Sequence, residues 1–394
     1  MIFSEKLRIL HLARWYPNRY DSMFGLFVQR HVEAVALKNE CYVVYAQPVP
    51  NLKTSIETDI EKMENIVCVR VYYRESQIRI PVLSNIIKGW KYINAIRKGL
   101  SVLKNQSLTF DFVHVHILTR LGLIALWLKL WFGVPYGITE HWSRYLPATN
   151  GFQGIFRKTA SRLIVRRASF VSTVTQNLQV AMLGHKLLNE NYFVLPNVVN
   201  PRMKYLPQIA KDNRFTFIHI STFDNQAKNI QGIIEAIAEL SLQRTDFKCV
   251  FVGEGLDFDD MKLLAASQIS VSDCYEFTGL LEHEVLANRM MQSHVLLLFS
   301  NYENFPVVIN EGLSLGLPVL ATNVGGISEV INSENGVLVS PRDVKELVKT
   351  MNMFIDGAFP FDGESIRQSF NNKYSAETIG NLLNNYYIQA LEKR

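Results

Sequence analysis

The chain has few of the features that mark secreted and metal-binding proteins. Among its 394 residues there are only four cysteines, and no two of them form a C-x-x-C pair. Scattered cysteines of this kind predict reduced, mostly buried thiols in a cytoplasmic protein. The first residues carry charges at Glu5, Lys6 and Arg8 and contain no continuous apolar segment. We therefore expect no signal peptide.

Long hydrophobic runs and the common glycine-rich phosphate loops are absent as well. The longest apolar run is LGLIALWL, at residues 121–128, and Lys129 follows it. A membrane-spanning helix needs ~20 apolar residues, so we expect this segment to be a helix buried in a protein core. The sequence contains neither a P-loop nor a G-x-G-x-x-G motif, which argues against the usual ATPase and dinucleotide-binding sites.

The net charge of +5 conceals an asymmetry between the two halves of the chain. Residues 1–207 hold 27 basic and 12 acidic residues, whereas residues 208–394 hold 14 and 24. Such an asymmetry suggests that the first half faces an anionic surface or ligand. Residues 86–104 and 156–167 are basic and amphipathic, which favours either a contact with an anionic membrane or an ordinary solvated helix face. No nucleic-acid-binding motif is present, and we expect no nucleic acid partner.

Short strands alternate with helices in two successive series. The first series predicts strands at 7–13, 41–47, 67–73, 111–116, 135–141, 170–174 and 192–196, with helices at 25–38, 84–104, 119–132, 154–169 and 175–185. A proline-containing linker at 196–207 precedes the second series. That series predicts strands at 215–221, 247–253, 274–279, 295–300, 318–323 and 336–340, and helices at 228–243, 257–268, 282–292, 306–315 and 343–354.

This alternation predicts an α/β fold with two Rossmann-like, doubly wound domains that face each other across a cleft. We assign the domains to residues 1–200 and 208–374. A final helix at 375–394 is expected to cross back to the N-terminal domain. Ligands of such sheets bind beyond the carboxyl ends of the strands, so the candidate site residues are those that follow each strand.

The segment NYENFPVVINEG follows a predicted buried strand and begins a helix. Asn304 is a candidate N-cap, and Pro306 is tolerated in the first helical turn. A helix N-terminus at the end of a strand is suited to phosphate. Glu303 lies just outside this helix and Glu311 about a turn and a half inside it, where a carboxylate could accept hydrogen bonds from a vicinal diol such as ribose. The alternative is that both glutamates are solvated surface residues.

Two positions near other strand ends are weaker candidates. Lys228 follows a predicted strand and loop near a helix start, where it could meet a diphosphate or simply be a surface lysine. Gly25, in the first strand-to-helix loop, would let the backbone approach a ligand closely, although turn geometry explains it equally well.

Histidines end one of the first-half strands. His114 and His116 share one face of DFVHVH, and no third ligand is apparent, so we expect an active-site or core histidine and no metal. Glu140, His141 and Arg144, in ITEHWSRY, come to the same end of the predicted sheet.

Taken together, these segments resemble a retaining glycosyltransferase of family four, which has the GT-B fold. In the second half the matching motifs are FVGEG, FTGLL, NYENFPVVINEGLSLGLPVLATNVGGISEVI and NGVLVSPRD. In the first half RWYPNRYDSMFGLFVQRHVEA, DFVHVH, TEHWS and VLPNVVN match more loosely. The resemblance implies a nucleotide-sugar donor of UDP or GDP type, no metal or other cofactor, and a hydroxyl of a glycan or lipid-linked glycan as the acceptor. The expected role is in capsule, exopolysaccharide or lipopolysaccharide assembly. From the basic amphipathic segments we expect peripheral binding to the inner face of the cytoplasmic membrane.

The resemblance also implies roles for individual residues. The catalytic group would be His116 near the reacting sugar carbon, Lys228 at the diphosphate and Glu303 at the donor sugar. The donor-binding group would be Gly25, Gly253, Leu280, Asn304, Phe305, Val307 and Glu311, with Leu280 near the base and Glu311 at the ribose. The acceptor side would hold Arg14, Glu140, His141 and Arg144.

The sequence departs from the family pattern in two places. Ser221 and Thr222 stand where the family often has Gly-Arg, so Lys228 would carry more of the phosphate binding. The segment PNVVN lacks a glycine that is common in the family. Two alternatives differ in class: another GT-B enzyme, such as a nucleotide-sugar epimerase or a phosphorylase, and a non-catalytic nucleotide-sugar-binding protein.

Overall fold

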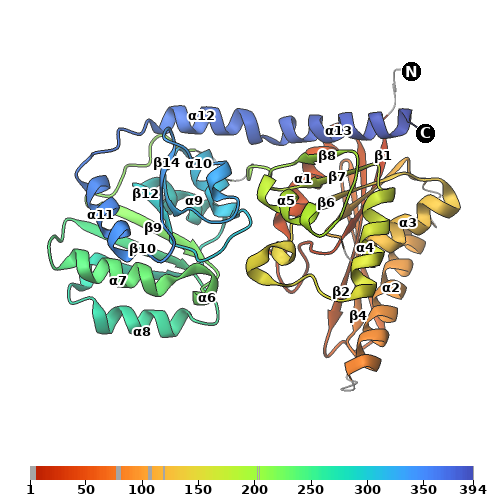
Figure 1. Cartoon of the computed structure of the whole chain (residues 1–394), viewed down its shortest axis with the longest axis horizontal. Coiled ribbons are helices and arrows are strands. Elements are labelled where there is room, and N and C mark those ends of the chain that lie inside the picture. The colour runs from red at the N-terminus through yellow and green to blue at the C-terminus, as the bar shows by residue number, and fades with distance from the viewer. Residues whose placement is uncertain are drawn as a thin grey trace. The chain divides into compact units, whose positions relative to one another are not determined.

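The computed structural model describes residues 6–76, 81–104, 109–118, 120–201, 203 and 205–393. The first five residues and linker positions 202 and 204 therefore lie outside the described residues. The chain divides into two compact units, which we call unit 1 (residues 1–198 and 376–394) and unit 2 (residues 199–375). Each unit holds a largely parallel sheet with helices packed against it (Figure 1), so the predicted α/β fold of two Rossmann-like domains is confirmed.

Unit 1 has an eight-stranded sheet in the order β3-β4-β2-β1-β5-β6-β7-β8. Its strands are β1 (Arg8–Ala13), β2 (Glu40–Val49), β3 (Ile56–Met63), β4 (Ile66–Arg74), β5 (Phe112–His116), β6 (Tyr136–Glu140), β7 (Phe170–Thr173) and β8 (Tyr192–Val194). Strand β3 is not among the predicted strands and runs antiparallel to β4 at the sheet edge. Its residues, IETDIEKM, are charged and partly or fully exposed, so they lack the apolar character by which the other strands were identified.

The helices of unit 1 are α1 (Leu26–Ala36), α2 (Pro81–Lys104), α3 (Arg120–Phe132), α4 (Ile155–Arg167), α5 (Gln176–Gly184) and the C-terminal α13 (Ala376–Glu392). Helix α13 packs on α1 so closely that a Cβ atom at Gly380 would lie 2.2 Å from the carbonyl oxygen of Ala34. The amide of Asn39 also donates a hydrogen bond to Asn384, at 3.0 Å. The glycine thus allows the last helix to complete the core of unit 1.

The expectation that residues 121–128 form a helix buried in the core is wrong for one side of α3. Leu121 and Ala125 are buried, but Leu123 and Trp127 are 45% and 41% exposed, and beyond this run Trp131 is 69% exposed. Helix α3 is apolar on all sides, so its sequence does not show which side faces the core. Among the described residues, no helix is both long enough and apolar enough to cross a membrane.

Unit 2 has a six-stranded parallel sheet in the order β11-β10-β9-β12-β13-β14. The strands are β9 (Phe215–Ser221), β10 (Phe247–Gly253), β11 (Tyr275–Gly279), β12 (Val295–Leu298), β13 (Val319–Thr322) and β14 (Gly336–Val339). The helices are α6 (Asn225–Lys228), α7 (Ile230–Ser241), α8 (Phe258–Gln268), α9 (His283–Gln292), α10 (Val307–Ser314), α11 (Val344–Ile355) and α12 (Gly363–Tyr374). Two of these helices were not predicted: α6 is a single turn, and α12 is mostly polar.

Successive residues of the unit 2 strands enter two different cores. Phe217, Phe251 and Leu297 belong to one apolar cluster, whereas Ile218 and Leu296 belong to another. Because side chains alternate along a strand, both faces of the sheet are buried under helices. This double burial explains why the strands appear as near-continuous apolar runs in the sequence.

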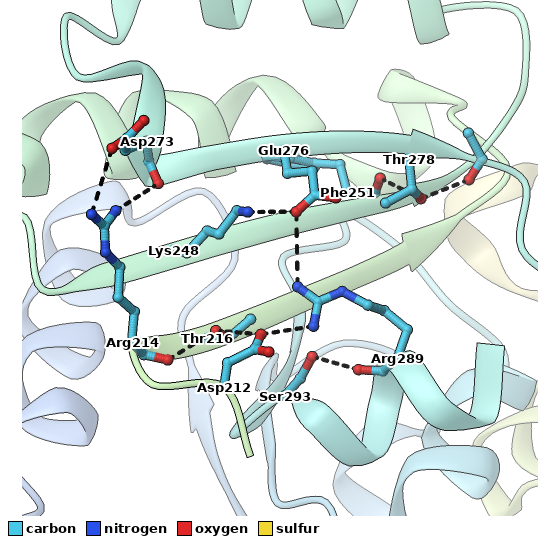
Figure 2. Close-up of polar contacts among 11 residues, drawn as sticks. Asp212, Arg214, Thr216, Lys248, Phe251, Asp273, Glu276, Thr278, Arg289 and Ser293 are labelled. Carbon is cyan, nitrogen blue, oxygen red and sulfur yellow. Dashed lines mark hydrogen bonds and ion pairs between the residues drawn. The ribbon is translucent and has the colours of Figure 1, made fainter. Parts of the chain in front are cut away.

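A charged network ties the amino-terminal ends of β9, β10 and β11 to α9. Figure 2 shows the Glu276 carboxylate between Lys248 Nζ, at 2.5 Å, and Arg289, at 3.9 Å. Arg289 also pairs with Asp212 at 2.7 Å, and Asp212 accepts a hydrogen bond from Thr216. The network lies at the end of the sheet opposite to the carboxyl ends of these strands, and we assign it a structural role.

All four cysteines are free and buried, as the sequence predicted. Burial raises the pKa of Cys68 to about 12, so this thiol is a poor nucleophile and packs as a small apolar side chain.

Candidate functional site

Lys228 and Glu303 meet at the point where the strand order of unit 2 reverses. The first strand, β9, lies beside the fourth strand, β12, and ligands of such sheets bind where two neighbouring strands lead in opposite directions. Lys228 follows β9 and Glu303 follows β12. Their side chains form an ion pair, and 19% of the Lys228 side chain and 10% of the Glu303 side chain are exposed. Ser300 Oγ also donates a hydrogen bond to Glu303 Oε1, at 3.0 Å.

Hydrogen bonds between the two loops fix the position of this ion pair. Lys228 is the last residue of α6, whose N-cap Asp224 accepts the N–H of Ala227. The backbone N–H of Asn301 donates to the carbonyl oxygen of Ala227, at 2.8 Å, and its side-chain amide donates to Gln226, at 3.0 Å. The loop after β12 is therefore bound to α6 independently of the two charged side chains.

The two adjacent glycines of the sequence motif pack directly on the backbone of Glu303. Gly325 has φ +58°, and a Cβ atom there would lie 1.7 Å from the carbonyl oxygen of Glu303. The next residue, Gly326, donates its N–H to the carbonyl oxygen of Asn304, at 2.9 Å. Only glycine allows this contact. The loop that follows β13 therefore packs against the Glu303 loop and holds its backbone in place.

Helix α10 begins at Val307, and its N-cap is Pro306. The prediction that Asn304 caps this helix is therefore wrong, because Asn304 lies two residues further back. Phe305 is buried and Val307 half-buried at this helix start, where the first-turn N–H groups of an α-helix have no intrahelical acceptor.

Glu311 lies further along α10 and is 8% exposed. Its Oε1 atom accepts a hydrogen bond from Asn200 Nδ2, at 3.5 Å. The structure thus places Glu303 before the helix and Glu311 within it, and neither is the solvated surface residue of the alternative interpretation.

Two further donor-site candidates end neighbouring strands. Gly253 ends β10, and a Cβ atom there would lie 1.9 Å from the carbonyl oxygen of Ser221, so its immediate role is to let the ends of β9 and β10 pack together. Leu280 follows β11 and is 48% exposed. Ser221 Oγ accepts the N–H of Phe223, at 3.3 Å, and so holds the loop in which the family often has arginine.

In unit 1, the candidate histidines belong to a larger buried group that we call the histidine cluster: His11, His31, His114, His116 and His141. Nitrogen atoms of His11, His114 and His116 lie within 4.8 Å of one another. This geometry overturns the statement that no third metal ligand is available. His11 could not be predicted as a third ligand because β1 becomes the neighbour of β5 only in the folded sheet.

Hydrogen bonds already occupy most ring nitrogens of these three histidines. His114 bonds to the Tyr387 hydroxyl, at 2.6 Å, and to Thr139 Oγ1, at 2.7 Å. His11 Nδ1 and His116 Nε2 lie 3.0 Å apart. We therefore interpret the cluster as a neutral hydrogen-bonded network. His116 is fully buried at the end of β5, so its ring lies beneath the surface at which a ligand would bind.

Burial governs the protonation of this region. It lowers the pKa of His11 to about 3 and that of His31 to about 4. Burial, together with neighbouring histidines, also moves the pKa of His116 well below its usual value. In the opposite direction, burial raises the pKa of Glu140 to about 7, although three backbone N–H groups donate to its carboxylate.

Gly25 precedes α1 with φ +74°, and a Cβ atom there would lie 2.4 Å from the carbonyl carbon of Trp15. The glycine therefore lets the loop fold back on its own first residues.

Arg14 and Arg144, two of the predicted acceptor-side residues, line one cavity of about 420 Å³ in unit 1. Glu140 and His141 are buried and do not line it. Arg120, Trp142, Phe156 and Arg157 line the same cavity. None of these four was a candidate site residue in the sequence: Arg120 lies on α3, Phe156 and Arg157 begin the basic amphipathic segment on α4, and Trp142 lies within the TEHWS motif. Their proximity depends on how these segments pack in the fold.

Comparisons with known proteins match both units. Residues 203–372 match the family model "Glycosyl transferases group 1", and residues 65–198 match the "Glycosyl transferase 4-like domain". A 2-deoxystreptamine glucosyltransferase of Streptomyces kanamyceticus is 26% identical over 58% of this chain, and the match spans 63% of that relative.

Solved structures that resemble the whole chain include the following two. Sucrose-phosphate synthase from Thermosynechococcus elongatus superimposes with a TM-score of 0.74 and 18% identity, covering 99% of this chain and 100% of that one. HepE of Anabaena in complex with UDP superimposes with a TM-score of 0.69 and 16% identity, covering 98% and 100%. At these identities the likeness establishes the fold.

Proposed function

Because this chain belongs to the glycosyltransferases of GT-B fold, we propose that it moves a sugar, with retention of configuration, from a nucleoside-diphosphate sugar to a hydroxyl group. The acceptor in this proposal is a glycan or lipid-linked glycan of a surface polysaccharide. The UDP that HepE binds supports a donor of UDP type, with GDP as the second possibility.

The observation that carries the proposal is the Lys228–Glu303 ion pair at the reversal point of the unit 2 sheet, beside the start of α10. Without a donor, the ammonium group of Lys228 and the carboxylate of Glu303 neutralise each other. When a donor binds, its diphosphate becomes the partner of Lys228, and the Glu303 carboxylate becomes available to accept hydrogen bonds from sugar hydroxyls. Glu311, on the same helix, takes the ribose hydroxyls, and Leu280 lies near the base.

In the reaction, the bond between the anomeric carbon and the diphosphate breaks, and negative charge develops on the leaving phosphate. Lys228 and the first-turn N–H groups of α10 are fixed donors that stabilise this charge, and we assign no metal to the step. The acceptor hydroxyl attacks from the face that the diphosphate leaves. Its proton passes to the departing phosphate oxygen, so the nucleoside diphosphate leaves protonated once.

We assign His116 a positioning role instead of a contact with the sugar. Its ring is buried among the other histidines, and its backbone carbonyl oxygen accepts the N–H of Arg14, at 3.3 Å. The residue therefore holds the end of β5 against the end of β1, from which Arg14 and the Gly25 loop begin.

Same-face attack and a covalent intermediate differ in what happens at Glu303. As the carboxylate assigned to the sugar, Glu303 would be the nucleophile of a covalent intermediate. We expect no glycosyl adduct on Glu303 when the parent enzyme is incubated with a 2-fluoro nucleotide sugar and examined by intact-protein mass spectrometry. We also expect Glu303→Gln to bind the donor while transfer slows at least tenfold, because an amide accepts fewer hydrogen bonds than a carboxylate.

A mass increase equal to one fluorinated sugar, mapped to Glu303, would replace same-face attack by double displacement. Nucleotide release that needs an added acceptor would support transfer over epimerisation. Full transfer activity of Glu303→Gln would remove Glu303 from the sugar site.

We further propose that the protein works at the inner face of the cytoplasmic membrane. The support is the excess of basic over acidic residues in residues 1–207 and the set of free, buried cysteines, which fits a reducing compartment.

A further inference from the structure

The cavity that Arg14 and Arg144 line concentrates positive charge. Two more arginines, Arg120 of α3 and Arg157 of α4, line it as well. Among the described residues, none of these four arginines forms an ion pair. Glu140 is a carboxylate that acts on Arg144, and three backbone N–H groups already donate to it.

The shape of the cavity is fixed partly by aromatic side chains. The Arg144 guanidinium lies 3.4 Å from the ring centre of Trp142, and that of Arg14 lies 5.2 Å from Tyr92. The Nε atom of Arg144 is buried without a hydrogen-bond partner among the described residues. Burial, with Arg157 and Arg14 nearby, lowers the pKa of Arg144. Mutually repelling guanidinium groups held together in this way are stabilised by a bound anion, and their planar donor sets suit phosphate.

The cavity also opens onto an apolar surface. Leu123 and Phe156 line it and are 45% and 93% exposed. Trp127 and Trp131 continue from Leu123 at intervals of four residues, so these side chains form one stripe along α3. Helices α3 and α4 pack side by side in unit 1 (Figure 1). Tryptophan is enriched where proteins meet the membrane–water interface.

We infer that this cavity, which we call the arginine pocket, binds the phosphate or diphosphate of a lipid-linked acceptor, whose apolar chain lies along the stripe Leu123, Trp127 and Trp131. This inference rests on the proposed function and names the class of its acceptor. The four arginines neutralise the phosphate charge, and the exposed aromatic side chains bury the lipid. The sugar that receives the new bond is then tethered to unit 1 by its own phosphate.

The experiment measures binding by isothermal titration calorimetry with three probes: farnesyl diphosphate, inorganic diphosphate and farnesol. We expect farnesyl diphosphate to bind at least tenfold more tightly than either of the others, because it alone presents both parts. Arg120→Ala/Arg157→Ala should weaken this binding at least tenfold. The matched control, Arg97→Ala/Arg166→Ala, removes two exposed arginines from α2 and α4 outside the pocket and should bind like the parent.

Two further variants separate the possible sources of binding. Trp131→Ser should weaken farnesyl diphosphate and leave inorganic diphosphate unchanged, which a purely ionic site would not show. Lys248→Ala should leave both unchanged, because Lys248 pairs with Glu276 in unit 2, outside the arginine pocket and the proposed donor site.

Unaltered binding in Arg120→Ala/Arg157→Ala would overturn the inference. Equal affinity for inorganic and farnesyl diphosphate would overturn the lipid assignment. The change in Tm caused by added nucleotides is measured in parallel, because it tests the proposed donor site in unit 2 separately. A protein that binds nucleotides but fails these tests contradicts the pocket alone, whereas a protein that binds farnesyl diphosphate but no nucleotide contradicts the proposed function.

Discussion

Replacing Lys228 with alanine is expected to lower the rate of sugar transfer by about 10²–10³-fold, the usual effect of losing one fixed donor to a developing charge. The effect should be large here because Ser221 and Thr222 supply no second cation where the family often has arginine. Since the charge is greatest in the transition state, kcat should fall more than the affinity for the donor. The measurement is the initial rate of nucleotide release with donor and acceptor.

Lys248→Ala is the matched control, because it removes a lysine of the same unit that pairs with Glu276 at the opposite end of the sheet (Figure 2). Lys228→Arg should recover part of the activity, because the charge is restored with a different geometry. If Lys228→Ala and Lys248→Ala show the same near-parent rate, Lys228 does not stabilise the leaving group.

Unit 1 is expected to lose stability steeply when the pH falls from 7.5 to 5. Each histidine of the cluster is buried and has a lowered pKa, to about 3 in His11 and about 4 in His31. The unfolded chain binds protons below pH ~6.5 whereas the folded unit does not, so the stabilisation is complete above that value and is lost as the pH falls. At pH 5 each such histidine lowers the free energy of unfolding by about 2 kcal/mol relative to its value at pH 7.5.

Glu140 acts in the opposite direction. Its pKa is raised to about 7, so the folded unit binds a proton that the unfolded chain releases, and this contribution grows as the pH falls. By the same linkage, the stability gained from Glu140 between pH 7.5 and 5 is about equal to the stability lost from one histidine. Unit 2 contains two histidines with lowered pKa, His219 and His294, so unit 1 should unfold first on acidification.

The test is urea unfolding at several pH values, followed by the fluorescence of the tryptophans, all five of which lie in unit 1. His11→Asn removes one titrating ring and should reduce the loss of stability by about 2 kcal/mol between pH 7.5 and 5. His283→Asn, at an exposed position of α9, is the control and should change nothing. A constant unfolding free energy across this range would show that the cluster is already protonated or solvated.

The sequence predicted most of the strands and helices because both faces of each sheet are covered, and covered strands are continuously apolar. The prediction was wrong for elements that are not buried on both sides. The edge strand β3 is charged and exposed, and α12 is largely polar. For α3, an apolar sequence on all sides did not reveal that Trp127 and Trp131 lie at the surface.

The part of the candidate site from Glu303 to Glu311 could be predicted from the sequence because it is contiguous, whereas the pairing of Glu303 with Lys228 depends on β9 lying beside β12. A strand, a loop with Glu303 and a helix with Glu311 lie within one short segment. The contacts made by Gly325, by contrast, depend on a second loop that folds onto the first. His11 and the arginine pocket draw on residues far apart in the chain, and their proximity is a property of the sheet order and of helix packing.

The central claim is that the segment from Glu303 to Glu311 holds a nucleotide. Its most direct test is the thermal unfolding of the parent and of Glu311→Ala with increasing UDP, GDP and ADP. A ligand that binds only the folded state raises the Tm by an amount that grows with the logarithm of its concentration once this exceeds the Kd. We predict that one nucleotide, UDP first, raises the Tm of the parent, that Glu311→Ala needs at least tenfold more of it, and that Glu334→Ala, at an exposed position of the same unit, behaves like the parent. No shift with any nucleotide, or equal shifts in the parent and Glu311→Ala, would contradict the account.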